Sequence, residues 1–226
     1  MSSVRFAGIK ACVFDAYGTL FDVHAAVRRH AEAVGPDADQ LSAIWRAKQL
    51  EYSWTRSLMG RYLDFWTLTE QALDYAYDCV PSADTSMKPA LLSAYQSLDC
   101  YEEVPSVIKA LKASGKQIAI LSNGSPGMLE SAVRAAGLDQ VFDAVFSVDP
   151  LEVYKTDERV YEMVTTHFRA YPEAVSFQSS NRWDIAGATA FGFRTVWINR
   201  TGMPDEYLDM PPAAVLPDLK GLAALG

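Results

Sequence analysis

The sequence predicts an α/β protein: a doubly wound, Rossmann-like parallel sheet with an inserted helical-bundle cap. Three observations lead to this prediction. Five short apolar runs are typical of buried strands, helical patterns separate most of them, and a long stretch after the first run has helical periodicity and no convincing strand. The 226 residues, 50% of them hydrophobic, suffice for one well-buried domain and a smaller helical insertion.

The predicted strands are short runs rich in apolar and β-branched residues, at 11–14, 118–121, 144–146, 174–177 and 195–198. Such runs, without alternating polar residues, are typical of strands that are buried on both faces. Helical patterns lie at 104–114, 127–136, 157–168 and 184–190. Gly115 and Gly137 end the first two of these patterns, as glycine commonly does. This alternation of strand and helix predicts parallel strands.

The stretch 21–100 is predicted to be the inserted cap. Its apolar residues recur at helical spacing, and the pattern fits a bundle of about four helices. We therefore predict a core domain made of residues 1–20 and 101–226 and a cap domain of residues 21–100. Ligands of open α/β sheets bind beyond the carboxyl ends of the strands, so a cap that leaves from the first strand would cover that site.

Charge and cysteine content narrow the possible partners and compartment. The chain has 28 acidic and 20 basic residues and a formal net charge of -8, which argues against nucleic-acid and membrane-surface partners. The three cysteines have no paired spacing, so we expect neither a disulfide framework nor a zinc site. No signal-peptide core or run of apolar membrane-span length is found. These features together predict a cytoplasmic protein.

The strongest motif is Val-Phe-Asp-Ala-Tyr-Gly-Thr-Leu at residues 13–20, where an apolar strand delivers Asp15 into a turn. A strand end holds a carboxylate rigidly, Gly18 permits a tight turn, and the hydroxyl of Thr19 can bind a carboxylate oxygen. This arrangement suits an aspartate nucleophile. Alone, however, the motif also fits an aspartate that merely caps a turn.

Further polar residues follow the other predicted strands. Ser122 and Asn123 end the second strand, Lys155 precedes a helix, and Asn181 and Asp184 follow a later strand. Because the carboxyl ends of parallel strands share one edge of the sheet, we expect these side chains to meet Asp15. Their convergence favours a catalytic site over a simple turn cap.

The chain resembles the haloacid dehalogenase superfamily and, more narrowly, the L-2-haloacid dehalogenases. The resemblance is carried by the segments FDAYGTLFDVH, WRAKQLEYSWTRSLM, AILSNGSP, VYK and SSNRWD, and it spans nearly the whole chain. It implies the haloacid dehalogenase-like fold and a hydrolase that converts short (S)-2-haloalkanoic acids and water into (R)-2-hydroxyalkanoic acids. It also implies a homodimer, for which the aromatic cap stretch 65–77 is a candidate interface.

The residues around Asp15 favour a reaction without a metal ion or other cofactor. Phosphoryl-transferring relatives have a second aspartate two positions after the nucleophile, where this chain has Tyr17. Their last motif is rich in carboxylates, whereas here Asp184 is the obvious acid. One carboxylate beside Asp15 is a poor magnesium site. A halide suits this site because it leaves as a weak base and requires no proton.

The resemblance implies a role for each matching residue. Asp15 attacks C2 of the substrate, and the halide leaves toward Arg46 and Asn123. Without the resemblance, Arg46 would be interpreted as a solvated arginine on a helix. The substrate carboxylate is expected to bind Ser122 and the backbone near Ala16, Tyr17 and Asn123. The residues expected to serve the later hydrolysis are Asp184, Lys155, Asn181 and Ser179, with support from Thr19 and Tyr161.

The predicted substrate pocket has an apolar wall made of Tyr17, Leu50, Phe65 and Trp183. Each of these residues taken singly is more typical of core packing. The chain departs from the family pattern at Thr156, where relatives have proline after the lysine, and at Gln178 and Arg182, where relatives have small or apolar residues. We expect Thr156 to loosen the presentation of Lys155, and Gln178 or Arg182 to alter the pocket rim and the range of substrates.

Three alternative functions remain open on the sequence. The first is a magnesium-dependent small-molecule phosphatase, against which Tyr17 argues. The second is a hydrolase that opens a strained ring of the azetidine-2-carboxylate type by the same attack of Asp15. The third is a non-catalytic binding protein on a dehalogenase scaffold, against which the retention of Asp15, Arg46, Lys155 and Asp184 argues.

Overall fold

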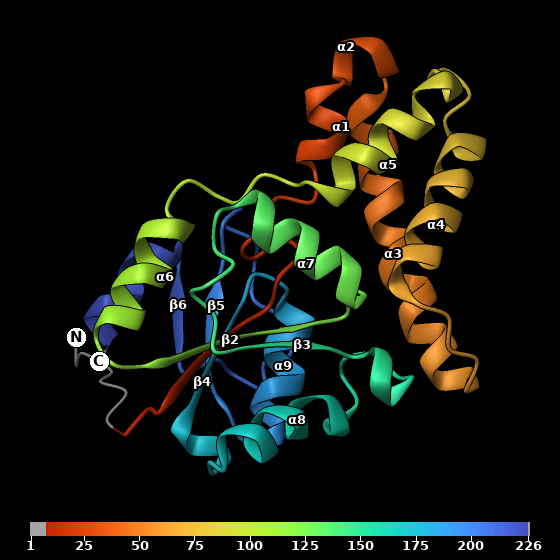
Figure 1. Cartoon of the computed structure of the whole chain (residues 1–226). Helices are drawn as coiled ribbons and strands as arrows, with labels where there is room; N and C mark the ends of the chain where they lie inside the picture. Colours follow the sequence, from red (N-terminus) through yellow and green to blue (C-terminus); the bar gives the residue numbers. More distant parts are fainter. Residues whose placement is uncertain (1–7, 226) are drawn as a thin grey trace.

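The computed structural model describes residues 8–225 and has a parallel sheet at its centre (Figure 1). In the described part of the chain, the sheet has six strands in the order β3-β2-β1-β4-β5-β6. Their bounds are Ala11–Phe14 for β1, Gln117–Ser122 for β2, Ala144–Ser147 for β3, Val175–Ser179 for β4, Arg194–Ile198 for β5 and Ala214–Leu216 for β6. The predicted doubly wound parallel sheet is confirmed.

All five predicted strands are present, with ends that differ from the prediction by at most two residues. The prediction missed β6, which has three residues and lies at the edge of the sheet. Its side chains are exposed or half-buried, and prolines stand two residues before it and directly after it. A short edge strand of this kind has no continuous apolar run by which the sequence could reveal it.

Helices cover both faces of the sheet (Figure 1). On one face, α6 (Val104–Ala113) packs against β2 and the C-terminal 3₁₀ helix η4 (Leu219–Leu225). On the other, α8 (Glu158–Phe168) and α9 (Arg182–Phe191) pack together, and α9 contacts β4 and β5. Helix α7 (Pro126–Ala135) packs against β3 and reaches α5 of the cap. Three short 3₁₀ helices complete the connections: η1 (Thr85–Met87), η2 (Asp149–Leu151) and η3 (Pro172–Ala174).

The helices of the stretch 21–100 lie together above the carboxyl ends of the strands (Figure 1). They are α1 (Ala25–Arg29), α2 (Ala31–Val34), α3 (Ala38–Met59), α4 (Phe65–Cys79) and α5 (Lys88–Gln96). The bundle was predicted to have about four helices and has five, because the helical segment 25–34 is divided at His30 into the short helices α1 and α2. The predicted division into core and cap at residues 20/21 and 100/101 stays a prediction.

The cap is held together by the pairing of helices α3 and α4, and it is joined to the core by the two neighbouring segments in which the chain enters and leaves it. Trp45 of α3 donates its indole N–H to the carbonyl of Thr69 on α4 at 2.8 Å. These two segments lie side by side. The backbone N–H of Tyr101 donates to the carbonyl of Leu20, and the backbone N–H of Asp22 donates to the carbonyl of Asp99. These bonds form the base on which the cap stands over the sheet.

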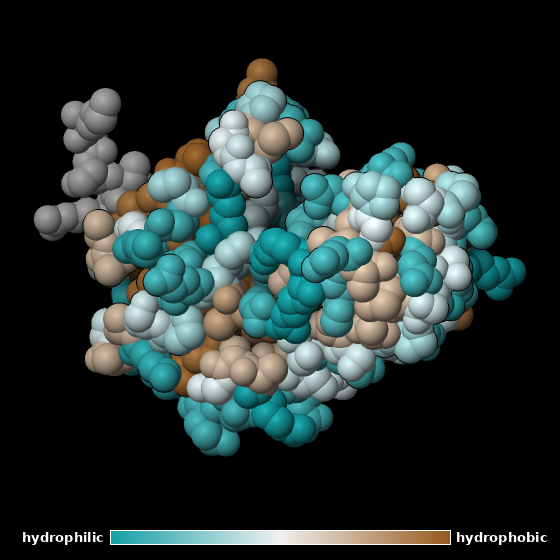
Figure 2. Space-filling model, turned by 90° about the horizontal axis from the view of Figure 1, so that it is seen from above, coloured by the Kyte–Doolittle hydropathy of each residue, from teal (hydrophilic) through white to brown (hydrophobic). Residues whose placement is uncertain are grey.

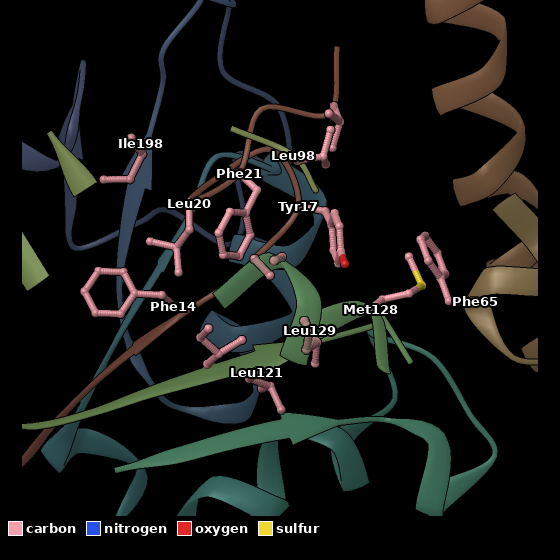
Figure 3. Close-up of a cluster of buried hydrophobic side chains, with 14 of the residues drawn as sticks. Phe14, Tyr17, Leu20, Phe21, Phe65, Leu98, Leu121, Met128, Leu129 and Ile198 are labelled. Atoms are coloured by element: carbon pink, nitrogen blue, oxygen red, sulfur yellow. The ribbon is translucent and has the colours of Figure 1, made fainter. Parts of the chain in front are cut away.

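The apolar core continues from the sheet into the cap. Tyr17, which follows β1, and Met128 of α7 point toward Phe65 of the cap helix α4 (Figure 3). The rings of Tyr17 and Phe65 have centroids 6.3 Å apart. This shared cluster places the cap directly over the end of β1.

In residues 8–225, no helix combines the length and apolar character that a membrane crossing needs.

Candidate active site

The site is built where the central strands end. Asp15 directly follows β1, Ser122 is the last residue of β2, and Ser179 is the last residue of β4. Gly18, in the turn after Asp15, has φ +93°, a left-handed conformation that side chains other than glycine rarely adopt. The turn brings Thr19 back toward Asp15, whose side chain is buried.

Both carboxylate oxygens of Asp15 are held by hydrogen bonds. In the described residues, Oδ2 accepts from the hydroxyl of Thr19 at 3.0 Å, from the hydroxyl of Ser179 at 3.3 Å and from the amide Nδ2 of Asn181 at 2.8 Å. Oδ1 accepts from the ammonium Nζ of Lys155 at 3.0 Å. The orientation of this carboxylate is therefore fixed by the surrounding side chains.

Lys155 lies between two carboxylates and is 1% exposed. Its Nζ is 3.0 Å from Asp15 and 2.8 Å from Asp184. Burial opposes the charge of this ammonium, but the two carboxylates outweigh burial and raise the pKa of Lys155. The peptide bond from Lys155 to Thr156 is cis. Although no proline follows Lys155, its ammonium pairs with both carboxylates; the predicted effect of Thr156 on how the lysine is presented stays a prediction.

Asp184 is fully buried at the start of α9. Its Oδ1 accepts a hydrogen bond from the hydroxyl of Tyr161 at 2.9 Å, and its Oδ2 binds Lys155. Burial raises the pKa of Asp184 to about 6, and the charge of Asp15 adds to this rise while Lys155 opposes it. A carboxylate with this pKa suits a general base near neutral pH.

The cap contributes Arg46 and Leu50 from one face of α3. Arg46 Nη2 donates to the backbone carbonyl of Tyr17 at 3.2 Å and to Oδ1 of Asn181 at 3.5 Å. Both residues line a cleft of about 470 Å³ together with Asn181 and Trp183. The guanidinium of Arg46 thus faces the core and reaches Asp15 through Asn181, as a residue of the predicted site would, whereas its role with the halide stays a prediction.

Aromatic rings surround the turn after Asp15. Tyr17 stacks on Tyr95 of the cap with ring centroids 5.8 Å apart, and Phe65 contacts both Tyr17 and Tyr154. Burial raises the pKa of Tyr17 well above its ordinary value. The phenol of Tyr17 thus keeps its proton and is a poor proton donor in the place where phosphatases have an aspartate.

The residues predicted to bind the substrate carboxylate lie close by but outside the network around Asp15. The hydroxyl of Ser122 accepts a hydrogen bond from the backbone N–H of Gly124 at 3.0 Å. Asn123 Oδ1 accepts from the backbone N–H of Lys155 at 3.0 Å. Ala16 is buried, and its carbonyl accepts backbone bonds from the turn that follows. Ser122 and Asn123 therefore position neighbouring segments in this structure.

Gln178 and Arg182, which were both expected to alter the pocket rim, lie in different places. Gln178 lies in a cavity beside Cys12 and Leu111, on the face of the sheet that α6 and η4 cover. The expectation that it alters the pocket rim is wrong, because strand side chains alternate and Ser179 takes the face toward Asp15. Arg182 does line the cleft.

Sequence reasoning missed several residues of the site. Tyr95 is buried in the cap and contacts Tyr17, and the segment 199–206 after β5 forms one side of the cleft. Arg200 in this segment donates to the carbonyl of Thr19 at 2.9 Å. Neither Tyr95 nor Arg200 has a distinctive local pattern, since each meets the site only through the tertiary fold.

The residues that surround Asp15 in the structure do not fit a metal site. In residues 8–225, no three histidine, cysteine, aspartate or glutamate side chains lie close enough together to hold a metal ion. Between Asp15 and Asp184 stands the ammonium of Lys155. Lys155 thus places one positive charge of the chain itself between the two carboxylates.

Comparisons with known proteins assign the chain to a family. A family model for haloacid dehalogenase-like hydrolases matches residues 9–192. The chain is 50% identical over 218 residues to (S)-2-haloacid dehalogenase 1 of Pseudomonas sp. (strain CBS-3), covering 96% of each protein. It is 45% identical to a dehalogenase of known crystal structure, with a TM-score of 0.95 and coverage of 97% of this chain and 98% of the other.

A third similar protein is the L-2-haloacid dehalogenase of Xanthobacter autotrophicus, solved with chloropropionic acid covalently bound. It is 37% identical, has a TM-score of 0.84, and the match covers 95% of this chain and 96% of that one. Sequence and fold thus agree with those of these proteins over almost the whole length. The chain belongs to the haloacid dehalogenase-like hydrolases and, within them, to the (S)-2-haloacid dehalogenases.

Proposed function

We propose that this protein hydrolyses short (S)-2-haloalkanoic acids to (R)-2-hydroxyalkanoic acids through an ester on Asp15, without a metal ion. The proposal depends on one observation above all: Asp15 is buried in a cluster whose positive charge comes from Lys155, while Tyr17 stands where a metal-dependent phosphatase has its acid. The relative from Xanthobacter autotrophicus, which holds chloropropionic acid covalently, supports a covalent step.

In the first step, Oδ1 of Asp15 attacks C2 of the substrate from the side opposite the halogen. The new Oδ1–C2 bond forms as the carbon–halogen bond breaks, and the electron pair leaves with the halide, so the configuration at C2 inverts. Oδ1 is favoured over Oδ2 because it accepts a hydrogen bond from Lys155 alone among the described residues, whereas Oδ2 accepts from three groups. Arg46 and Asn123 are proposed to receive the halide.

Ser122 and the backbone near Ala16, Tyr17 and Asn123 are proposed to bind the substrate carboxylate. The hydroxyl of Ser122 accepts one hydrogen bond and keeps its own proton for donation. Leu50, Phe65 and Trp183 would enclose the alkyl group. Binding on two sides aligns C2 with Asp15, so orientation replaces a metal ion as the means of lowering the barrier.

In the second step, water attacks the carboxyl carbon of the Asp15 ester and passes one proton to Asp184. The developing negative charge falls on Oδ2, where Thr19, Ser179 and Asn181 already donate. These three donors are arranged to act as an oxyanion hole, because they point at an oxygen that gains charge in the transition state.

The bond between the carboxyl carbon and Oδ1 then breaks, and the 2-hydroxyacid leaves with Oδ1 as its hydroxyl oxygen. Lys155, 3.0 Å from Oδ1, gives it a proton and regains one from Asp184, which is 2.8 Å away. The Asp15 carboxyl loses its proton to solvent, and the site returns to its starting charge. Tyr161 holds Asp184 in place throughout.

The decisive experiment is halide release from each enantiomer of 2-chloropropionate in the presence of EDTA, with the Asp15→Asn variant as control. We expect release from the (S)-enantiomer only, and none from the variant. Release of phosphate from p-nitrophenyl phosphate that EDTA abolishes would instead show a metal-dependent phosphatase. A single turnover in oxygen-18 water adds a direct test, because the isotope should enter Asp15 before it appears in the released acid.

We further propose that the protein is a homodimer that associates through the cap. The predicted interface stretch 65–77 is partly used within the chain, since Phe65 and Tyr77 are buried. Tyr75 on α4 is 41% exposed, and Leu58 near the end of α3 is 89% exposed. Viewed from above, hydrophilic and hydrophobic residues are interspersed over the surface (Figure 2). Sedimentation of the unmutated protein should show a dimer, and the Tyr75→Glu variant should show a larger fraction of monomer at the same concentration.

A cytoplasmic location is proposed from the cysteines. Cys12, Cys79 and Cys100 are all free thiols in the structure. Unpaired cysteines are typical of a reducing compartment. Cell fractionation that finds the protein in an oxidising compartment would contradict this proposal.

A further inference from the structure

The segment 199–210, which follows β5, has no regular secondary structure, and its residues 199–206 form one wall of the cleft that Arg46, Leu50 and Asn181 also line. Residues 201–209 are exposed. A segment with so few buried apolar side chains has little packing of its own to fix it, and it would open easily without specific tethers. The width of the cleft therefore depends on what holds this wall.

Arg182 of α9 is the tether at the far end of the wall. Its Nε donates to Oδ1 of Asp205 at 2.6 Å, and its Nη2 donates to the backbone carbonyls of Tyr207 and Met210 at 3.0 Å each. The guanidinium also faces the rings of Trp197 and Tyr207, at 5.8 and 5.6 Å. The side chain is 3% exposed, so these contacts are made in a desolvated environment where they are strong.

Arg182 also stands between two residues of the site at the start of α9. Asn181, directly before it, binds Asp15, and Trp183, directly after it, lines the cleft. Trp183 also lines a neighbouring, largely apolar cavity of about 460 Å³, together with Tyr207 and Met210. Trp183 and the tethered segment thus line both the cleft beside Asn181 and this second cavity.

We infer that Arg182 determines the length of 2-haloacid that the protein accepts, by fixing the segment 199–210 as the outer wall of the cleft. This inference rests on the proposed dehalogenase function and names a specificity-determining residue for it. With the wall fixed, an alkyl chain that extends beyond C3 meets Trp183 and the tethered segment. With the wall released, the chain gains a path toward the second cavity, whose lining is mostly apolar.

The test is the ratio of kcat/KM for (S)-2-chlorohexanoate to that for (S)-2-chloropropionate, measured in the unmutated protein and in Arg182→Ala. We expect the ratio to rise by at least about tenfold, since a few methylene groups in an apolar pocket change transition-state binding by this order. Hydrogen exchange at residues 200–210 should rise in the same variant. Arg182→Lys should restore part of both effects, because an ammonium can pair with Asp205 but lacks the planar fork of donors.

Two further variants complete the design. Asp205→Asn weakens the tether while it leaves Arg182 buried, and it should raise the ratio less than Arg182→Ala does. Arg159→Ala is the matched control, because Arg159 makes the same kind of pair with Asp157 on the exposed surface of α8. Faster exchange with an unchanged chain-length ratio would overturn the inference. If the unmutated protein releases no halide from any 2-haloacid, the proposed function itself fails, and the exchange data still show whether Arg182 tethers the wall.

Discussion

At the scale of single residues, charge balance around Lys155 decides what the site can do. One buried ammonium faces two buried carboxylates, so the cluster as a whole carries a net negative charge. Esterification of Asp15 would remove one negative charge and leave Lys155 and Asp184 as a neutral pair. The cluster is therefore better balanced in the proposed intermediate than in the free protein, which favours formation of the ester.

If Asp15 is the nucleophile and Asp184 the base, Asp184→Asn should stop the reaction after the ester has formed. Asp15 keeps its three donors to Oδ2 and still attacks C2, but no carboxylate remains to accept a proton from water. Mass spectrometry of the variant after incubation with (S)-2-chloropropionate should show one covalent adduct on the peptide that contains Asp15. Asp15→Asn is the control and should show no adduct. Full turnover by Asp184→Asn would remove Asp184 from the role of base.

The raised pKa of Asp184 predicts a specific pH dependence. A base acts only when ionised. Asp184 acts after the carbon–halogen bond has broken, so its protonation should slow hydrolysis of the ester rather than lower kcat/KM. Once Asp15 is esterified, its charge no longer raises the pKa of Asp184, so the rate of ester hydrolysis should fall with pH only below about 6. Hydrolysis of the ester in single turnovers, measured against pH at constant ionic strength, tests this dependence. A hydrolysis rate that stays constant from neutral pH down to about pH 4 would contradict this assignment.

At the scale of secondary-structure elements, the contact between α8 and α9 holds the base in position. Gly187 on α9 faces Tyr161 and Thr156, and a Cβ atom built on it would lie 2.6 Å from the Tyr161 hydroxyl and 2.6 Å from Thr156 Cγ2. Tyr161 in turn donates to Asp184. The absence of a side chain at this one position lets the two helices approach closely enough for that hydrogen bond.

Gly187→Ala is therefore expected to destabilise the protein, although alanine normally favours a helix over glycine by about 1 kcal/mol. Overpacking against Tyr161 and Thr156 should cost about 1–3 kcal/mol and also lower kcat by moving Asp184. Urea unfolding and steady-state kinetics measure the two effects. Gly127→Ala on α7 is the matched control, because a Cβ there meets no atom within 4 Å, and it should be neutral or slightly stabilising. Equal stability of the two variants would contradict the packing argument.

At the scale of the whole molecule, Glu103 and Arg200 join segments that are far apart in the sequence. Arg200 Nη1 lies 2.8 Å from Glu103 Oε1, its Nη2 donates to the carbonyl of Thr19, and its guanidinium stacks on Tyr101 at 3.7 Å. Glu103 also accepts a hydrogen bond from the backbone N–H of Leu219. The pair thus connects the return from the cap, the turn after Asp15 and the C-terminal 3₁₀ helix.

Glu103→Gln should cost about 1–3 kcal/mol of stability at neutral pH, because a buried charged hydrogen bond is lost. Burial alone would raise the pKa of Glu103, but backbone donors and Arg200 lower it below its ordinary value. The stabilisation by this carboxylate is therefore full above the pKa of the unfolded chain and disappears as the pH falls through the lower pKa of the folded protein. Thermal unfolding should show a difference from the unmutated protein at pH 7 that shrinks below about pH 4. A constant difference would contradict an electrostatic origin.

The sequence by itself determined the parallel sheet and the meeting of Asp15, Lys155, Asn181 and Asp184 at one edge. Both follow from local patterns, because alternating strands and helices impose parallel strands, and parallel strands place their carboxyl ends together. The short edge strand β6 escaped prediction because it has no buried run of its own. The same periodicity could have placed Gln178 correctly, since Ser179 next to it faces Asp15 and neighbouring strand residues point to opposite faces.

Only the tertiary structure decided which donor reaches which oxygen of Asp15, and what Arg182 and Arg200 hold. Arg182 contacts residues 23 to 28 positions away, and Arg200 contacts Thr19 across 181 positions. No local pattern encodes such contacts, because an arginine has the same sequence neighbours whether its guanidinium is solvated or buried. The position of the cleft wall is therefore a property of the packed chain, whereas the catalytic edge of the sheet is already implied by the order of its strands.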